Sequence, residues 1–330
     1  MNRPLKLLAL GAVLSTGITL NSAAHAEYTL TLCGASPGGL WSLLGAGVDN
    51  ALKAAHPGST VTYQTSGGGF ANVMQIEQKK CDLALIHDAE AKAALNGDEP
   101  FTGTVDSMRT VAVLYTWAPM QLLVSKAFAE EHGLTSLEDL AAKKVAARVL
   151  LNRRGNVASG VGESMLNAAG ASIENLESWG GSVTFAASKE QGEMMRDRRA
   201  DAILNSLFVN HSSIRQLAEA IDLALLPISP ETATAVAEEW SIGEYVIAAD
   251  AYDFADQDTL TVTLSAQLFV HQDADEQMVT DLTTALVEKI DELRGVHNAM
   301  APLDAALLAS ASTVAYHPAA EAVYKAKGLK

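Results

Sequence analysis

The chain has 330 residues, of which 48% are hydrophobic, and a formal net charge of −16. This length predicts about two globular domains, each large enough to bury a core of its own. So acidic a surface repels phosphate backbones, which argues against nucleic acid as a partner.

The first 26 residues have the features of a secretory signal peptide. Arg3 and Lys6 precede a largely apolar run over residues 7–20, and Ala24-His25-Ala26 forms a small-x-small cleavage site. The apolar run is shorter than the about 20 residues that span a bilayer. An uncleaved N-terminal anchor is the alternative. We expect cleavage after Ala26 and a soluble periplasmic protein.

Strand and helix patterns alternate strictly through the next part of the chain. The apolar patterns predict strands over residues 28–33, 59–64 and 82–86 and helices over residues 40–55, 70–80 and 88–95. Alternation of this kind implies right-handed crossovers onto a parallel sheet.

The same alternation begins again further along the chain. It predicts helices over residues 136–143, 162–169, 188–199 and 212–220 and strands over residues 145–151, 183–187 and 202–204. Ser188 and Gln191 have the spacing of a capping box at the start of one of these helices. The repetition indicates a second lobe of similar α/β construction.

Two long extended segments, residues 110–125 and 259–271, link these halves. Both exceed the usual strand length of about six residues, and Pro119 interrupts the first. Two crossings mean that both ends of the chain build the first lobe. We therefore predict lobe I over residues 27–117 plus 262–330 and lobe II over residues 118–261. Each lobe would have a central mixed sheet, with a two-segment hinge and a cleft between them.

The two cysteines are predicted to be free, buried thiols. Cys33 would end the first strand and Cys81 would begin the third. In parallel neighbours this places their Cα atoms several residues apart, at about 3.3 Å per residue. A disulfide tolerates at most about 7 Å.

Gly34, Ser36 and Gly38 spell G-x-S-x-G, the nucleophile elbow of serine hydrolases. In such an elbow the residue after the serine donates its N–H group to the oxyanion. Here that residue is Pro37, which has no N–H group. We therefore assign no catalytic residue to this loop and expect a binding protein rather than an enzyme.

A binding role suits the loops that follow the first three strands. Glycine-rich helix starts offer free N–H groups and a partial positive charge to an anion such as a carboxylate. Because the carboxyl ends of parallel strands share one sheet edge, we expect these loops to form one lip of a cleft. The candidate ligand-binding residues here are Ser36, Gly38, Gly39, Leu40, Trp41, Ser66, Gly67, Gly68, His87 and Asp88.

The second lobe offers a matching set of candidates. Arg153 could clamp a carboxylate, although a solvated surface charge is an equal alternative for it and for Arg154. Ser159 and Gly160 are expected just before a helix, as another N-terminal anion site. Asn205 and Phe208 follow the last strand of that lobe and could line the cleft. Histidine and cysteine spacings make no metal site, and no nucleotide-binding loop is present, so we expect neither metal nor cofactor.

Six segments together resemble the substrate-binding proteins of TRAP transporters, in particular the TAXI class. The segments span nearly the whole chain after the signal peptide, and their order and spacing carry the resemblance. They are "SPGGLWSLLG", "SGGGFAN", "CDLALIHDAEAKAALNG", "LTSLEDLAAKKVA", "ASGVGESML" and "YHPAAEAVYKAKG".

The resemblance implies a type II periplasmic binding protein fold with a hinged cleft. It implies capture of a small organic anion or amino acid and delivery to a TRAP membrane permease. We expect the protein to be a monomer. Leu40 and Trp41 stand where the family carries hydroxyl-bearing residues, and Val161 replaces a threonine. These departures favour a carboxylate with a less polar tail. A ligand-sensing periplasmic module and an enzyme on the same fold are the alternatives. By position, the resemblance implies ligand contacts at Gly39, Trp41, Ser66, Gly67, Gly68, Asp88, Ser159 and Gly160.

Overall fold

A computed structural model describes residues 26–37, 39–310 and 312–330 of the chain. Nearly all of the expected signal peptide and the candidate Gly38 therefore lie outside the described residues. Among the residues that are described, no helix is both long and apolar enough to cross a membrane.

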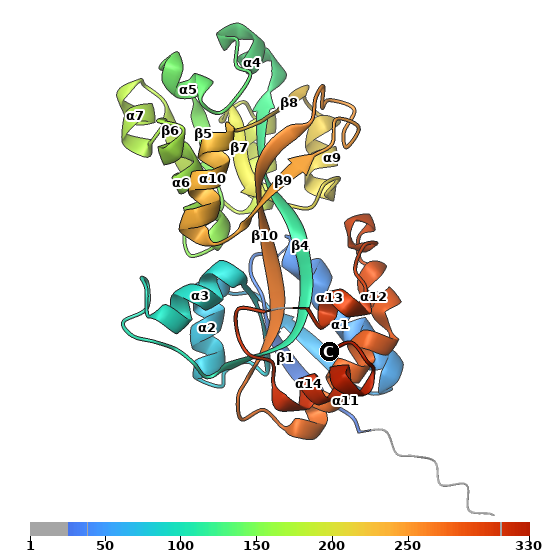
Figure 1. The fold of residues 1–330 in the computed structure, drawn as a ribbon. Helices are drawn as coiled ribbons and strands as arrows, with labels where there is room; N and C mark the ends of the chain where they lie inside the picture. The colour runs from blue at the N-terminus through green and yellow to red at the C-terminus, as the bar shows by residue number, and fades with distance from the viewer. Residues whose placement is uncertain (1–25, 38, 311) are drawn as a thin grey trace, which may run out of the picture.

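The elements follow one another in α/β order (Figure 1). The strands are β1 (Thr29–Cys33), β2 (Thr60–Gln64), β3 (Leu83–His87), β4 (Met108–Ser125), β5 (Arg148–Leu151), β6 (Ser182–Phe185), β7 (Ala202–Ser206), β8 (Leu223–Leu226), β9 (Gly243–Ile247) and β10 (Thr259–His271). The helices are α1 (Leu40–Ala55), α2 (Gly69–Glu77), α3 (Asp88–Asn96), α4 (Lys126–His132), α5 (Asp139–Ala142), α6 (Val157–Ala168), α7 (Ile173–Ser178), α8 (Ser188–Arg196), α9 (Ser212–Ala218), α10 (Pro230–Trp240), α11 (Glu276–Glu288), α12 (Ile290–Arg294), η1 (Asn298–Met300), α13 (Ala305–Leu308) and α14 (Pro318–Ala326).

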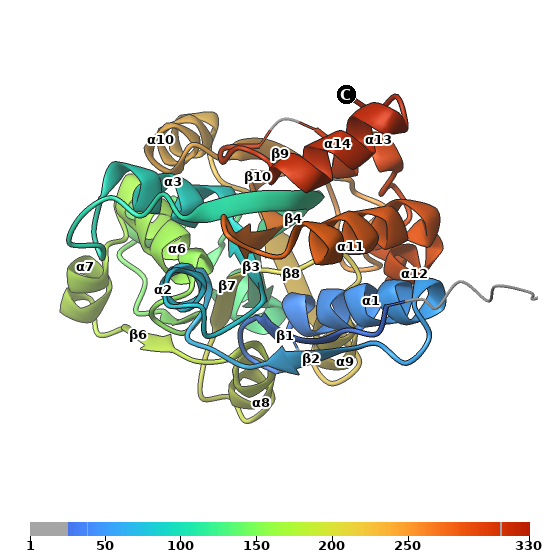
Figure 2. The same ribbon diagram turned by 90° about the horizontal axis from the view of Figure 1, so that it is seen from below.

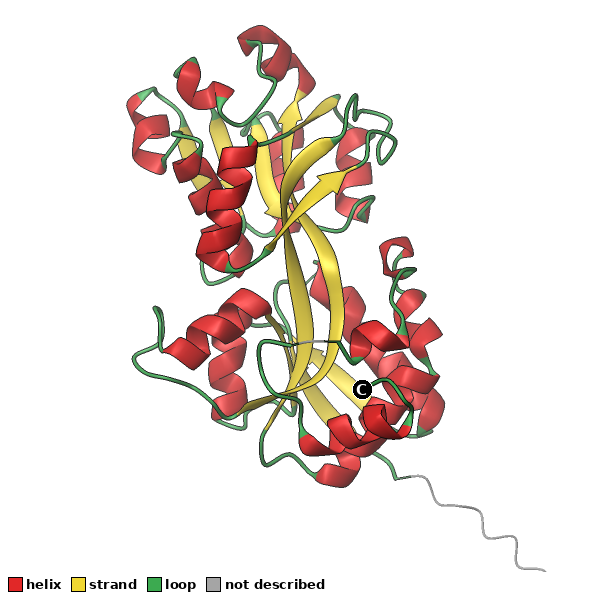
Figure 3. Ribbon diagram, in the orientation of Figure 1, coloured by secondary structure: helices red, strands yellow, loops and turns green. Residues whose placement is uncertain are grey.

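These elements form two lobes joined by β4 and β10 (Figures 1 and 3). We call lower lobe the part built on β1, β2 and β3 with α1–α3 and α11–α14, and upper lobe the part built on β5–β9 with α4–α10. The sheet order is β2-β1-β3-β10-β4-β7-β5-β6, with β8 beside β4 and β9 beside β10. The predicted parallel pairing of the first three strands is confirmed, since β1 is parallel to both β2 and β3.

Strand β4 runs through both lobes without a break. Its residues up to Pro119 pair with β10, whereas Met120 and the residues after it pair with β7 and β8. Pro119 therefore lies where the strand exchanges partners, a position at which its missing N–H group is tolerated. The predicted boundaries at residues 117/118 and 261/262 fall inside β4 and β10 and stay a prediction.

Helices cover both faces of the lower sheet, as Figure 2 shows from below. Leu32 and Leu85 face a core shared with α1, α11 and α14. Ala84 and Ile86, which alternate with them along the chain, face a second core with α2 and α3. Strands buried on both faces read as continuous apolar runs, which is why the sequence pattern located them well.

The predicted free thiols are wrong, because Cys33 and Cys81 form a disulfide with Cα atoms 5.9 Å apart. The prediction placed Cys81 in line with the third strand. In the structure β3 begins only at Leu83, and Cys81 belongs to the connection that arrives from α2. Both cysteines lie in the core that α2 covers, beside Ile76. Cys81 therefore lies on the face of the sheet that α2 covers, within disulfide distance of Cys33.

The disulfide gives a first prediction. Cys33 and Cys81 are separated by 48 residues, and closing a loop of this size in the unfolded chain stabilises the fold by roughly 2–4 kcal/mol. Denaturant unfolding with and without reductant is expected to show that difference. Unreduced protein should also resist alkylation after unfolding, and full alkylation without reductant would contradict the assignment.

Candidate functional site

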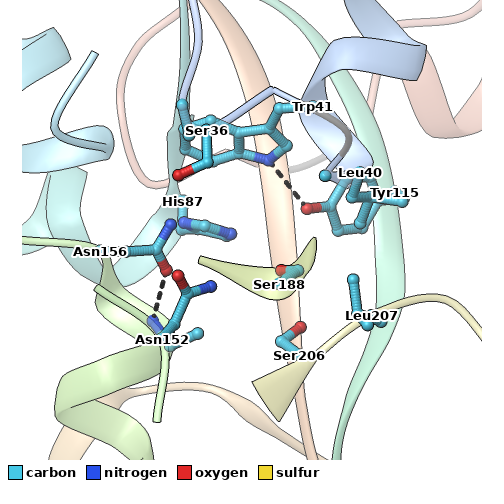
Figure 4. A pocket seen from close by; sticks show the side chains of 13 residues that line it. Ser36, Leu40, Trp41, His87, Tyr115, Asn152, Asn156, Ser188, Ser206 and Leu207 are labelled. Carbon is cyan, nitrogen blue, oxygen red and sulfur yellow. Dashed lines mark hydrogen bonds between the residues drawn. The ribbon is translucent and has the colours of Figure 1, made fainter. Parts of the chain in front are cut away.

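A small cavity lies between the two lobes (Figure 4). Its volume is about 50 Å³, which leaves room for only a few waters in this arrangement. The cavity is lined by Ala35, Ser36, Gly39, Leu40, Trp41, His87, Tyr115, Asn152, Asn156, Ala158, Ser188, Ser206 and Leu207.

The lower lobe and β4 supply an aromatic wall of Trp41, Tyr115 and His87. The indole Nε1–H of Trp41 donates to the Tyr115 hydroxyl at 3.0 Å, and the Trp41 and His87 rings lie 4.5 Å apart. Burial raises the pKa of Tyr115 above its usual range, although the bond from Trp41 works in the opposite direction. Tyr115 therefore keeps its proton, and its hydroxyl can still donate a hydrogen bond.

The upper lobe supplies a polar wall. Asn152 Nδ2 donates to Asn205 Oδ1 at 3.0 Å, and Asn205 Nδ2 donates to Ser188 Oγ at 3.1 Å and to Gln191 Oε1 at 2.9 Å. Asn205 is buried behind the lining and does not itself line the cavity. These bonds fix Asn152 and Ser188 in orientation, since a buried amide in a bonded network has little freedom.

Helix N-termini reach the cavity from both lobes. Gly39 precedes α1 and Ala187 precedes α8, and neither helix has a side-chain cap. Gly39 lines the cavity, as do Leu40 and Trp41 of α1 and Ser188 of α8. The first N–H groups of a helix lack intrahelical partners and carry partial positive charge. Because the described lining contains no lysine or arginine, an anion here would meet backbone N–H groups instead.

Five of the predicted site residues line this cavity, namely Ser36, Gly39, Leu40, Trp41 and His87. The remaining described candidates do not line it. Arg153 is exposed, and Phe208 is fully buried against Tyr115 and His297. Asp88 accepts hydrogen bonds from Ser265 and Gln267 on β10.

The glycine-rich loop of Ser66, Gly67 and Gly68 touches the upper lobe. Ser66 Oγ donates to the Gly34 carbonyl at 2.5 Å, which fixes the loop to the end of β1. Gly68 has a φ of +113°, and a Cβ atom added there would lie 2.7 Å from the Gly155 carbonyl oxygen. Glycine is thus needed for a close approach of two backbones.

Ser159 and Gly160 were predicted to lie just before a helix, but the structure places both of them inside α6. Helix α6 begins earlier, at Val157, because the Asn156 side chain accepts from the Ala158 N–H group and caps it. A Cβ atom on Gly160 would lie 2.6 Å from the Trp240 ring of α10. Gly160 therefore permits helix packing, and the glycines that suggested a loop lie inside the helix.

The predicted capping box at Ser188 is also absent. Ser188 is the first residue of α8 rather than its cap, and its hydroxyl accepts from Asn205. Sequence reasoning missed eight lining residues: Ala35, Tyr115, Asn152, Asn156, Ala158, Ser188, Ser206 and Leu207. Asn152 and Asn156 flank the arginine pair that drew attention by its charge, and an asparagine before an apolar run is itself a helix-cap signal.

A second contact between the lobes involves two histidines. His211, which precedes α9, stacks on His297, which precedes η1, with ring centroids 5.9 Å apart. His211 Nδ1 accepts from the Ser213 N–H group at 3.2 Å. Burial, with smaller contributions from His297 and Arg215, lowers the pKa of His211 to about 4.

The fold is that of type II periplasmic binding proteins, as three solved structures show. BugD, a periplasmic binding protein, matches with a TM-score of 0.56 and 14% identity over 84% of this chain and 88% of its own. MatC from Rhodopseudomonas palustris with bound malate matches with a TM-score of 0.55 and 16% identity. The match covers 83% of this chain and 88% of MatC. PhnD1 from Prochlorococcus marinus in complex with methylphosphonate matches with a TM-score of 0.52 and 12% identity. The match covers 92% of this chain and 99% of PhnD1.

Residues 32–328 match the model of the NMT1-like family, and the chain belongs to that family. No curated protein matches the chain. At no more than 16% identity, the structural likenesses establish the fold alone.

The bond between Trp41 and Tyr115 gives a second prediction. Tyr115→Phe leaves the buried indole N–H group without its acceptor, which costs about 1–3 kcal/mol of unfolding free energy. Chemical denaturation measures the loss, and Tyr245→Phe on β9, at a partly exposed tyrosine, is the matched control. Equal stability of the two variants would contradict the role of this bond.

The histidine stack gives a third prediction. Because the pKa of His211 is lowered in the fold, the unfolded chain binds the proton more readily. The contribution of His211 to stability is therefore fully present above about pH 6.5 and is lost as the pH falls toward about 4. At about 1.4 kcal/mol per pKa unit, the loss reaches roughly 3 kcal/mol by pH 4.

His211→Asn keeps a side chain that can cap α9 and removes the titrating group. Unfolding free energies measured from pH 7.5 to 4.5 should fall less steeply for the variant than for the wild type. Parallel pH profiles would refute this account.

Proposed function

We propose that the protein is an exported solute-binding protein of the periplasm that captures a small carboxylate between its lobes. The observation that carries the proposal is the pair of uncapped helix N-termini, α1 from below and α8 from above, which line one cavity. Such helix ends are natural anion sites. The malate in MatC and the methylphosphonate in PhnD1 are likewise small anions, bound by proteins of the same fold.

The lining also supports a ligand with a less polar part. Leu40, Trp41 and Leu207 are nearly fully buried and face the same cavity as the polar wall. A carboxylate held at the helix ends would place its carbon skeleton against these side chains. Apolar contact of this kind excludes water and orients the ligand.

We further propose that the loaded protein delivers its ligand to a TRAP-type membrane permease, as the resemblance to the TAXI class implies. In that role the ligand is released unchanged, so the cavity needs no nucleophile. Arg153 remains a candidate contact in an arrangement where the lobes are placed differently.

Thermal shift against organic acids and amino acids tests the capture. A ligand at 100 times its dissociation constant stabilises the fold by about 2.7 kcal/mol. Recovery of the ligand unchanged after incubation separates capture from catalysis. If no carboxylate stabilises the protein, the proposal fails.

Two variants of Ser188 then test the helix end itself. Ser188→Pro removes the first N–H group of α8, and proline is favoured at this helix position. Ala187, the preceding residue, has φ −67° and ψ 151°, which a following proline accepts. Ser188→Ala is the matched control, because it removes only the hydroxyl.

A hydrogen bond to a charged group contributes about 1.5–3 kcal/mol, so Ser188→Pro should bind the carboxylate at least about tenfold more weakly than Ser188→Ala. Calorimetric titration gives both dissociation constants. Equal affinities would show that the ligand does not use this helix end.

A further inference from the structure

Glu90 lies in the first turn of α3 and has no exposed surface (0%). Its Oε2 atom accepts from the backbone N–H group of His87 at 3.0 Å and lies 3.1 Å from His87 Nδ1. Its Oε1 atom accepts from the backbone N–H group of Val157 at 3.1 Å. Val157 is the first residue of α6 in the upper lobe. A single carboxylate therefore bonds to both lobes.

Side chains of the protein itself thus accept hydrogen bonds from the first backbone N–H groups of α6. Asn156 accepts from the Ala158 N–H group, and Glu90 accepts from that of Val157. The positive end of a helix dipole also favours a negative charge beside it. A ligand anion would meet competition from Glu90 at α6 and none from a side-chain cap at α1 or α8.

The lower lobe is shaped around this carboxylate. A Cβ atom added to Gly69, the first residue of α2, would lie 1.5 Å from Glu90 Oε2. The adjacent Gly68 lies against the Gly155 carbonyl of the upper lobe. Any side chain at Gly69 would displace Glu90 from its present position, so the loop and the carboxylate fit as one unit.

The energetics of this contact suit a reversible junction. With the lobes apart, water solvates the carboxylate. With the lobes together, the Val157 N–H group and the α6 dipole replace that water. For buried charges, the cost of desolvation and the gain from new partners nearly cancel. An apolar contact of equal area would instead favour the joined state alone.

We propose that Glu90 is a positioning residue that joins the two lobes and couples their contact to the cavity. The coupling runs through His87, which lines the cavity, lies 4.5 Å from the Trp41 ring and bonds to Glu90. This second part of the inference rests on the proposed function. The joining of the lobes does not, because it can be measured without a ligand.

Glu90→Asp provides the test. The side chain is one methylene shorter, so it can still bond within the first turn of α3 but no longer reaches Val157. In the ligand-free mature chain, hydrogen exchange at the Val157 amide should become about tenfold faster or more, as loss of one charge-assisted bond predicts. Small-angle scattering should show a larger radius of gyration. Glu130→Asp, at an exposed site on α4, is the matched control.

Gly69→Ala tests the same contact with the charge of Glu90 intact. It should displace the carboxylate and accelerate exchange at Val157 in the same way. Gly103→Ala is its control, because nothing lies within 4 Å of a Cβ atom added there.

Unchanged Val157 exchange and an unchanged radius of gyration in both variants would overturn the proposal. Equal acceleration across the core strands of the upper lobe would overturn it too, since that indicates general loss of stability. Failure to find any ligand would refute the proposed function and leave these measurements intact. With a ligand, Glu90→Asp should raise the dissociation rate and leave the association rate nearly unchanged.

Discussion

The antiparallel pairing of β4 with β10 is the constraint on which the rest of the structure depends. These two strands run through both lobes, and β4 exchanges β10 for β7 and β8 at Pro119. Their pairing sets how far apart the lobes lie and which surfaces face each other. The cavity, the bond from Glu90 to Val157 and the stack of His211 on His297 all form between surfaces that this pairing brings into register.

Much of the fold could be predicted from the sequence, because its strands and helices carry local patterns. The continuous apolar run of β3 indicates a strand buried on both faces, and the spacing of apolar residues in α1 indicates a helix buried on one face. Two features could not be found this way. The glycines of α6 suggest a loop in the sequence, whereas in the structure they make room for Leu151 and Trp240. The disulfide depends on the path of the chain from α2 into β3, which no local pattern indicates.

The site was predictable on one side only. Ser36 and Gly39 follow β1, His87 is the last residue of β3, and parallel strands bring such ends to one edge. Tyr115 lies in the middle of a long strand, and nothing in its neighbours indicates that it accepts from Trp41. Ser188 matches a capping pattern, yet its partner is Asn205 on another element. Contacts between distant segments decide these roles, and a local pattern does not record them.

The loop from Ser66 to Gly69 has a consequence for how ligand preference can change by mutation. It meets the upper lobe through backbone atoms, and side chains at Gly68 or Gly69 would collide with Gly155 or Glu90. Gly68 and Gly69 therefore leave no room for a side chain in this arrangement of the lobes. Substitutions that retune the cavity must fall on residues whose side chains have room, such as Leu40, Asn152 and Ser206. An engineer seeking a new ligand would randomise those positions and leave the glycines alone.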